Sequence, residues 1–124
     1  MIRIEKESIK NKKISSKKEI KKLIKNGKKW TSNSICVIYK KNCFNVDRYA
    51  FIVSKKHGNA VKRNRIKRIL RETVRRNKRN KQPFYDFIIQ PEPGYEIDNN
   101  EIKIKLLSCF SDVEKNSVIT FKNY

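Results

Sequence analysis

The apolar residues that follow Gly58 recur with helical spacing. They occupy positions i, i+3, i+4, i+7 and i+8, namely Ile66, Ile69, Leu70, the nearly apolar Thr73, and Val74. This spacing places them in one stripe along an α-helix, where they can be buried together. Asn59 is a suitable N-cap, and Pro83 disfavours helical geometry in the residue before it. The pattern therefore predicts a long amphipathic helix between these two residues.

Two further helices are predicted, one on each side of this central segment. The first has the capping-box spacing of Ser16 and Glu19 at its start and Gly27 as a C-terminal stop. Its apolar side consists of Ile20, Leu23 and Ile24. A helix this short is marginal in water, so it must lie on another surface, most simply a sheet face. The last helix is expected from residue 98 or 99 to 111, and its apolar side consists of Ile102, Leu106, Leu107, Cys109 and Phe110.

Segments rich in β-branched and aromatic residues predict strands at 30–40, 48–54 and 84–90. The second alternates, with Tyr49 and Phe51 on one face and intervening residues on the other. The first two strands, joined by a short polar link, are expected to form an antiparallel hairpin. The end of the chain also has β propensity, so residues 117–124 form either a short edge strand or a disordered tail.

The predicted elements follow one another in the order α-β-β-α-β-α. This order indicates an α+β fold in which a small three- to four-stranded sheet is packed with helices. At 124 residues the chain has the length of one domain. Residues 1–13 are polar and rich in lysine, so we expect a flexible basic arm there and a single α+β domain over residues 14–124.

Charge identifies the central helix as a binding surface. The chain has a formal net charge of +20, and residues 55–81 contain thirteen Lys or Arg against the single acid Glu72. The residues that point away from the apolar stripe at about 100° per residue are Asn64, Lys67, Arg68, Arg71 and Arg75. A face of one sign repels itself unless an anion binds to it. Because Lys and Arg displace the counterions condensed on phosphates, we predict that the domain binds nucleic acid.

Composition also limits the compartment and the metal chemistry. The three cysteines contain no C-x-x-C pair, and there is one histidine, so no metal is expected on protein side chains alone. No secretory signal is visible, and no apolar run approaches the ~20 residues that span a bilayer. We therefore expect a cytoplasmic protein with no membrane contact. No obligate protein partner is evident.

No catalytic residue is predicted in the protein. Metal-dependent nucleases gather carboxylates around Mg²⁺, whereas the twelve acids here are scattered. Glu72 is expected to pair with a neighbouring arginine, and His57 is expected to be solvated or to touch a phosphate. Two rival functions remain open. One is a protein-only nuclease that uses Glu72 and His57, and the other is a ribosomal or DNA-binding protein whose Arg-rich helix enters a groove.

Residues 53–71, the signature segment, read VSKKHGNAVKRNRIKRILR. This string resembles the signature of the bacterial ribonuclease P protein component, whose family carries a KK-x-G-NAV-x-RNR-x-KR-x-x-R run. The matching residues are Lys55, Lys56, Gly58, Asn59, Ala60, Val61, Arg63, Asn64, Arg65, Lys67, Arg68 and Arg71. A weaker similarity extends from about residue 16 to 112.

The resemblance implies an α+β fold with an unusual left-handed βαβ crossover around the signature helix. It also implies the protein subunit of ribonuclease P, a ribonucleoprotein endonuclease that removes the 5′ leader from precursor tRNA. In that family the RNA subunit is expected to perform catalysis with its own Mg²⁺. The residues expected to bind the catalytic RNA are Lys55, Lys56, Asn59, Lys62, Arg63, Asn64, Arg65, Lys67, Arg68, Arg71 and Arg75.

A second site implied by the resemblance is a cleft between the first helix and the sheet that holds the single-stranded leader. Ile20, Ile24 and Tyr39 are expected to line it, with Tyr49 and Phe51 as further stacking platforms. Relatives often carry an aromatic residue, typically Phe, where this chain has Ile20 and Ile24. Stacking is worth about 1–3 kcal/mol per base, so this departure is expected to weaken leader binding or shift it to the aromatics. From the residues alone, the two isoleucines either contact the leader or belong only to the core.

Overall fold

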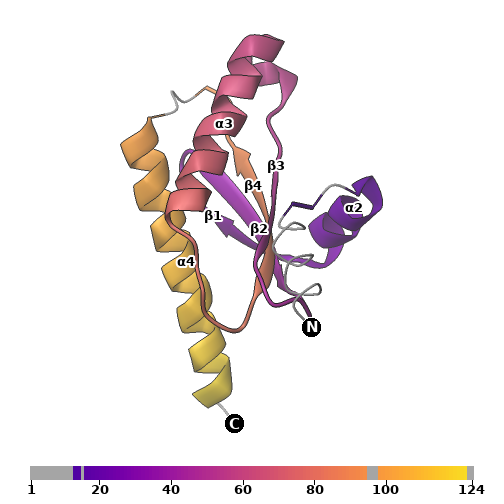
Figure 1. Ribbon diagram of the computed structural model, residues 1–124, viewed down its shortest axis with the longest axis vertical. Coiled ribbons are helices and arrows are strands. Elements are labelled where there is room, and N and C mark those ends of the chain that lie inside the picture. The colour runs from indigo at the N-terminus through magenta and orange to yellow at the C-terminus, as the bar shows by residue number, and fades with distance from the viewer. Residues whose placement is uncertain (1–12, 15, 95–97, 123–124) are drawn as a thin grey trace, which may run out of the picture.

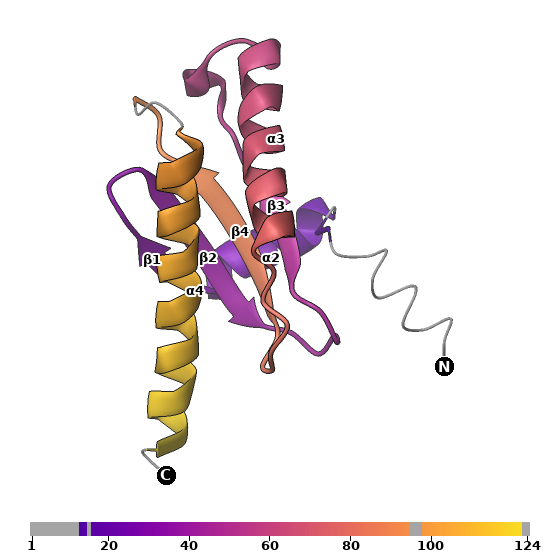
Figure 2. The same ribbon diagram turned by 60° about the vertical axis from the view of Figure 1, so that its left-hand side comes forward.

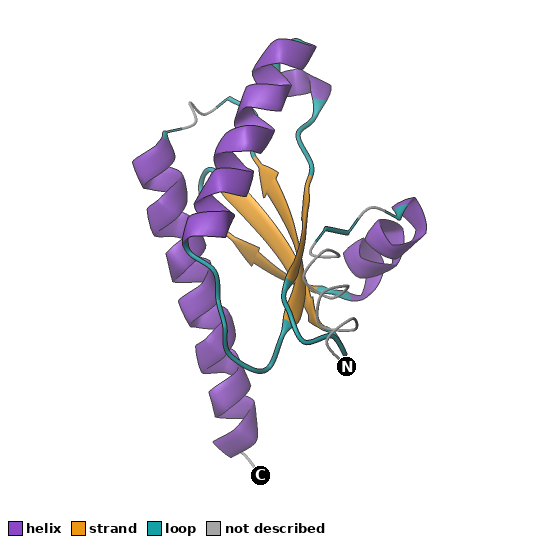
Figure 3. Cartoon of the chain, in the orientation of Figure 1, coloured by secondary structure: helices purple, strands orange, loops and turns teal. Residues whose placement is uncertain are grey.

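The structure is a computed structural model that describes residues 13–14, 16–94 and 98–122, with side chains as far as residue 115. Its helices and strands are α2 (Lys17–Asn26), β1 (Lys28–Thr31), β2 (Ile35–Lys41), β3 (Arg48–Phe51), the 3₁₀ turn η1 (Lys55–His57), α3 (Ala60–Arg76), β4 (Tyr85–Pro91) and α4 (Asn99–Lys122). The strands form one sheet in the order β1-β2-β4-β3. Helices α3 and α4 lie on one face and α2 on the other (Figure 1, Figure 2), so three layers result (Figure 3). The predicted α+β class is confirmed.

The first predicted strand is two strands. The segment 30–40 is interrupted by a turn in which the amide of Ser32 donates to the carbonyl of Ile35 at 2.9 Å. As a result β1 and β2 pair as an antiparallel hairpin with Trp30 opposite Val37. The observed element order is therefore α-β-β-β-α-β-α, one strand more than predicted.

The predicted hairpin between the second and third observed strands is wrong. β4 lies between β2 and β3, antiparallel to β2 and parallel to β3. Paired on both edges and covered on both faces, β4 is a buried strand, and its Phe87, Ile88 and Ile89 are 0% exposed. The parallel pairing of β3 with β4 also confirms the expected βαβ crossover, which passes through η1 and α3. Its left-handed sense remains an expectation from the resemblance.

The sheet separates two hydrophobic cores, because side chains alternate along each strand. On one face, Val37, Phe87 and Ile89 pack with Leu70 of α3 and Leu106 of α4. The predicted stripe of α3 is thus confirmed, although Ile69 is only half-buried. The smaller core on the other face contains Ile14, Leu23, Cys36, Ile38, Ala50 and Ile88.

The end of the chain is helical. The helix α4 extends to Lys122, so the expected edge strand or disordered tail at 117–124 is wrong for the residues described, 117–122. Val113, beyond the predicted end at residue 111, is 1% exposed, whereas Leu107 is 41% exposed. Burial of Val113 therefore helps to continue α4 past the predicted end. Residues 1–12 of the expected basic arm lie outside the described residues, and Ile14 is buried with its amide bonded to the carbonyl of Tyr49 at 2.9 Å.

No helix among the residues described here is both long enough and apolar enough to cross a membrane.

The start of α2 confirms its predicted cap, and its end depends on a glycine that touches the sheet. Ser16 accepts a hydrogen bond from the amide of Glu19. Gly27 ends α2 as expected, with its amide donating to the carbonyl of Leu23 at 2.7 Å, but its backbone is extended, with φ −78° and ψ 162°. A Cβ at Gly27 would lie 2.7 Å from both Ile38 Cγ2 and the carbonyl oxygen of Leu23. Gly27 is therefore required by close approach between α2 and β2.

Gly27→Ala is expected to destabilise the packing of α2 on the sheet. Movement of the Ile38 side chain alone cannot relieve both contacts, because the other contact is to the backbone carbonyl of Leu23. Overpacking of this kind costs about 1–3 kcal/mol, which denaturant unfolding would measure. Asn26→Ala is the matched control, since Asn26 is the exposed last residue of the same helix and its truncation fills no space. Equal loss in the two variants would contradict the close-approach explanation.

Candidate nucleic-acid interface

The signature segment begins with a rigid loop on the edge of the sheet. Gly58 has φ 125°, a left-handed conformation that favours glycine. Asn59 caps α3 as predicted, and its Oδ1 accepts from the amide of Lys62 at 2.9 Å. His57 is 7% exposed, and its Nε2 lies 2.9 Å from the carbonyl oxygen of Pro91. The expectation that His57 is solvated or touches a phosphate is therefore wrong, because its ring anchors η1 to the end of β4.

The predicted RNA-binding residues lie together on η1 and the outer side of α3. Ile66, Leu70, Thr73 and Val74 are buried, so the opposite side of the helix faces solvent. The exposed cations and amide of this side, here called the signature face, are Lys55, Lys56, Lys62, Asn64, Arg65, Arg68, Arg71 and Arg75. Of the remaining predicted residues, Arg63 and Lys67 are half-buried at its margin, and Asn59 is occupied as the cap.

The signature face has little internal neutralisation. Within the described residues, Glu72 is the only acid on α3, and it pairs with Arg75 at 2.6 Å and Arg76 at 3.1 Å. Hydrogen bonding from Arg75, with the charge of Arg76 nearby, lowers the pKa of Glu72. Over the part of the chain described, Arg65, Arg68 and Arg71 make no ion pair. Their guanidinium groups are free to neutralise phosphates, which is the role that the charge of residues 55–81 predicted for this face.

The expected leader cleft is not assembled from the residues predicted for it. Tyr39 and Tyr49 are 7% and 8% exposed and belong to the core under α3 and α4, and Phe51 packs against that core. Ile20 lies on the opposite side of the sheet, against the smaller core, and Ile24 is 46% exposed on α2. The three aromatics are therefore wrong as partners for α2, because odd and even positions of a strand face opposite sides of the sheet.

A different groove lies beside α2. It runs between α2, the end of β2 and the loop that follows, and is here called the α2 groove. Its lining residues are Ile14, Glu19, Lys22, Leu23, Lys40, Lys41, Asn42, Cys43, Phe44 and Asp86. It offers three lysines and one exposed aromatic ring, Phe44, which is 44% exposed. Sequence reasoning missed Phe44, although a lone aromatic residue in a polar connection was a visible signal.

Arg48 holds the α2 groove together. Its guanidinium donates to Asp86 of β4 at 2.8 Å and to Glu19 of α2 at 2.7 Å, and it stands 4.4 Å from the ring centroid of Phe44. Hydrogen bonding to Asp86 is the main cause that raises the pKa of Arg48. One fixed cation thus connects the helix, the sheet and the loop ring, and it leaves one side of that ring available for stacking.

The structure separates the groups that a protein-only nuclease would need. His57 is held at the start of the signature segment and Glu72 stands in the last turns of α3, paired with two arginines. An acid–base pair must reach the same substrate atoms, which these two cannot do. Burial raises the pKa of the Cys109 thiol to about 12, so it remains protonated. In the part of the chain described, no three His, Cys, Asp or Glu side chains gather in a metal-binding group.

Comparisons with known proteins agree with the signature. The sequence model of the family described as Ribonuclease P matches residues 9–114. The Ribonuclease P protein component of Petrotoga mobilis is 34% identical over 110 residues, covering 85% of this chain and 93% of that protein. That of Fusobacterium nucleatum is 36% identical over 97 residues, covering 78% and 82%.

Solved structures agree with the fold. The RNase P protein from Thermotoga maritima is similar with a TM-score of 0.71 and 26% identity, covering 78% of this chain and 93% of that one. The Staphylococcus aureus RNase P protein is similar with a TM-score of 0.72 and 26% identity, covering 82% and 94%.

Proposed function

The chain belongs to the family of bacterial ribonuclease P protein components, and on this premise we propose how it serves the ribonucleoprotein that processes tRNA. The signature face of α3 binds the catalytic RNA, and the α2 groove holds the single-stranded 5′ leader of precursor tRNA. The RNA subunit, with its own Mg²⁺, cuts the phosphodiester bond. The protein contributes positive charge, and it positions the leader of the precursor tRNA.

The observation that supports this proposal best is the construction of the signature face. A long apolar stripe, with Leu70 at 0% exposure, holds α3 on the sheet, while Arg65, Arg68 and Arg71 of the motif remain exposed on its outer side. The backbone conformation of Gly58 and the anchoring of His57 fix where this face begins. An array of cations on a fixed helix is suited to two RNAs that repel each other, because it neutralises phosphates of both.

Reconstitution tests the division of labour. Precursor tRNA is incubated with the purified protein, with the catalytic RNA at physiological salt, and with both. We expect rapid removal of the leader only in the last mixture, because His57 and Glu72 cannot act together. Cleavage of precursor tRNA at full rate by the RNA-free protein would overturn the proposal.

The leader is the part of the substrate that suits the α2 groove. Single-stranded nucleic acid binds where cations follow the backbone and an aromatic ring stacks on a base. Lys22, Lys40 and Lys41 supply the cations, and Phe44 supplies the ring that α2 itself lacks. The aromatic residues that relatives carry on the first helix are thus replaced in this chain by one ring on the facing loop.

Phe44→Ala is expected to weaken binding of precursor tRNA by the assembled ribonucleoprotein by about 1–3 kcal/mol, the value of one stacked base. Binding of mature tRNA, which has no leader, should stay unchanged. Phe44→Trp keeps a stacking ring and should restore the difference between the two substrates. Leu107→Ala removes a similarly exposed apolar side chain, 41% against 44%, on the opposite face of the sheet. An equal effect of that control on precursor tRNA would count against the groove.

A further inference from the structure

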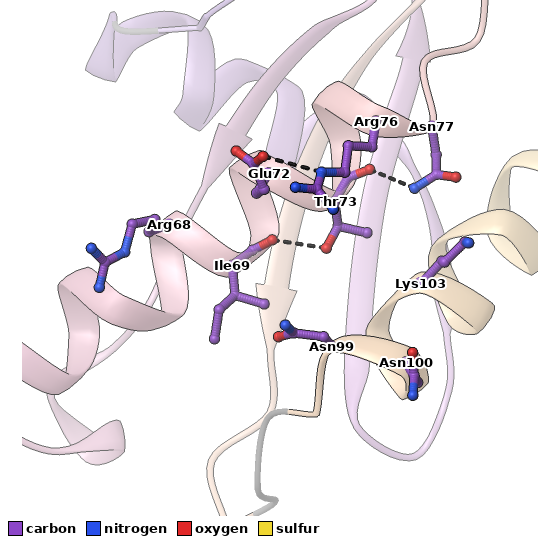
Figure 4. A pocket seen from close by; sticks show the side chains of 9 residues that line it. All are labelled: Arg68, Ile69, Glu72, Thr73, Arg76, Asn77, Asn99, Asn100 and Lys103. Atoms are coloured by element: carbon purple, nitrogen blue, oxygen red, sulfur yellow. Dashed lines mark hydrogen bonds and ion pairs between the residues drawn. The ribbon is translucent and has the colours of Figure 1, made fainter.

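A second groove lies between α3 and α4, on the face of the sheet opposite α2. Figure 4 shows its two walls, with Arg68, Glu72 and Arg76 on α3 and Asn99, Asn100 and Lys103 on α4. Its floor consists of Ile69, Thr73 and Asn77. Its volume is about 480 Å³, which is many times the ~30 Å³ share of one water molecule. We call it the α3–α4 groove, and it contains no residue of the smaller core or of the α2 groove.

The polar side chains of the floor donate to backbone carbonyls of α3, and on the walls Glu72 and Arg76 pair with each other. Thr73 Oγ1 donates to the carbonyl of Ile69 at 2.8 Å, and Asn77 Nδ2 donates to the carbonyl of Thr73 at 2.8 Å (Figure 4). Within the described residues, the side chains of Arg68, Lys103, Asn99 and Asn100 have no hydrogen-bond partner or ion pair. The groove therefore presents hydrogen-bond donors without a partner at its rim, whereas the side chains of Thr73 and Asn77 in its floor already donate to backbone carbonyls.

The charge of the groove is positive even after its one acid is counted. Arg68, Arg76 and Lys103 supply three cations, and Glu72 supplies one carboxylate. That carboxylate is already shared between Arg75 and Arg76. Figure 4 shows Arg68 at one end of the groove, with its guanidinium turned away from α4. Cations and free carboxamide N–H groups are the donors that phosphate oxygens accept from.

Arg68 connects this groove to the signature face. It belongs to both, and at about 100° per residue Arg65 lies one turn earlier on the same side of α3. Lys103 of α4 lines the same groove as Arg68, so a polynucleotide backbone that crosses Arg65 and Arg68 can continue along the groove to α4. We infer that the α3–α4 groove binds backbone phosphate of the catalytic RNA, with Lys103, Asn99 and Asn100 of α4 as contacts that the signature does not include. This inference rests on the proposed function.

The test replaces Lys103 with glutamate and measures affinity of the protein for the catalytic RNA between 50 and 200 mM salt. One lost phosphate contact lowers the salt slope by about 0.9, so the fall in affinity over this range should shrink about threefold to fourfold. Lys103 is exposed, so the fold should persist. Asn100→Asp, which adds a negative charge to the same wall with almost no change in volume, should weaken binding in the same direction.

Lys115→Glu is the matched control. Lys115 is exposed on the same helix, and about three turns of 5.4 Å separate it from Lys103. Lys115→Glu changes the net charge of the protein by the same amount as Lys103→Glu. It therefore reports only the effect of net charge on RNA affinity, without loss of a contact in the groove. Equal salt slopes for Lys103→Glu and Lys115→Glu would overturn the inference. If Arg65→Ala still lowered the slope in that case, the proposed function would stand without it.

The source of the phosphate is tested separately with inorganic phosphate and with the catalytic RNA. In amide NMR spectra of the protein, the RNA should shift Asn99, Asn100 and Lys103 at stoichiometric ratios, and Lys103→Glu should abolish these shifts. Inorganic phosphate should shift them only at millimolar excess. Saturation by inorganic phosphate at stoichiometric ratios, with no response to RNA, would show a site for a free anion and contradict the assignment.

Discussion

Replacing Arg79 with alanine is expected to lower the free energy of unfolding by about 3–5 kcal/mol, the usual result of removing one partner from a buried ion pair. The side chains of Arg79 and Asp47 are 3% and 2% exposed, and their ion pair is 3.0 Å long. Arg79 also donates to Glu114 at 2.9 Å and to the carbonyl of Pro83 at 2.6 Å. Its loss leaves a carboxylate buried with fewer donors, and denaturant unfolding would measure the effect.

The loss is expected to depend on pH in a defined direction. Burial raises the pKa of Asp47, and removal of the Arg79 charge raises it further. An acid whose pKa is higher in the folded than in the unfolded state binds its proton more tightly in the fold, so protonation favours folding as pH falls. The deficit of Arg79→Ala against the parent protein should therefore be largest near neutral pH and shrink below the raised pKa.

Lys78→Ala is the control for Arg79→Ala. It removes a neighbouring cation that is exposed, so its effect should stay within about 0.5 kcal/mol. Arg79→Lys keeps the charge but not the forked donors that reach two carboxylates and two carbonyls, and it should fall between the two. A loss for Arg79→Ala no larger than that of Lys78→Ala would show that the buried pair contributes nothing net.

The second large effect is expected from removing three cations of the signature face together. Arg65, Arg68 and Arg71 are exposed and carry no ion pair within the described residues. If each contacts one phosphate, the triple alanine variant should lower the salt slope for catalytic RNA by about 2.7, so that the fall in affinity between 50 and 200 mM salt shrinks about fortyfold. Titration of RNA at several salt concentrations measures this slope.

A variant with the same loss of charge elsewhere separates contact from net charge. Lys28, Lys29 and Lys115 are exposed and lie on β1 and α4, away from the signature face. Their triple alanine variant should keep the parent slope, because lysines that contact no phosphate displace no condensed counterions. A slope that falls equally in both triple variants would mean that RNA senses the total charge of the protein and not the signature face.

Local patterns determined the helices and the character of the signature face. Asn59 caps α3 because its own side chain accepts the bond from Lys62, and the stripe through Ile66 and Leu70 is buried because its spacing matches one helix turn after another. Both relations join residues three or four apart. The outward direction of Arg68 and Arg71 follows from the same spacing, so the chain alone was enough to predict it. Lys67 was predicted to point outward as well, but it is half-buried at the margin of the signature face.

Strand pairing was decided by contacts between distant segments. The strand pattern at 48–54 is compatible with any neighbour, and its placement beside β4 depends on residues 85–91 lying between it and β2. The buried pair of Arg79 with Asp47 joins the segments that precede these parallel strands, across a separation of 32 residues. No local spacing predicts such a contact.

The leader site was likewise predicted in part from the sequence and decided in part by the tertiary structure. Its general position, beside the first helix, followed from the resemblance, yet its aromatic residue did not. Tyr39, Tyr49 and Phe51 have the side chains that stacking needs, but their strand positions turn them toward α3 and α4, whereas the loop brings Phe44 to α2 through Arg48. The sequence by itself determined where each helix starts, the charged surface and the family, because these depend on neighbours along the chain, whereas it did not predict that α4 continues to Lys122. Only the tertiary structure decided which face of the sheet each aromatic ring occupies and which helices enclose each groove, because a one-residue change in strand register reverses every side chain.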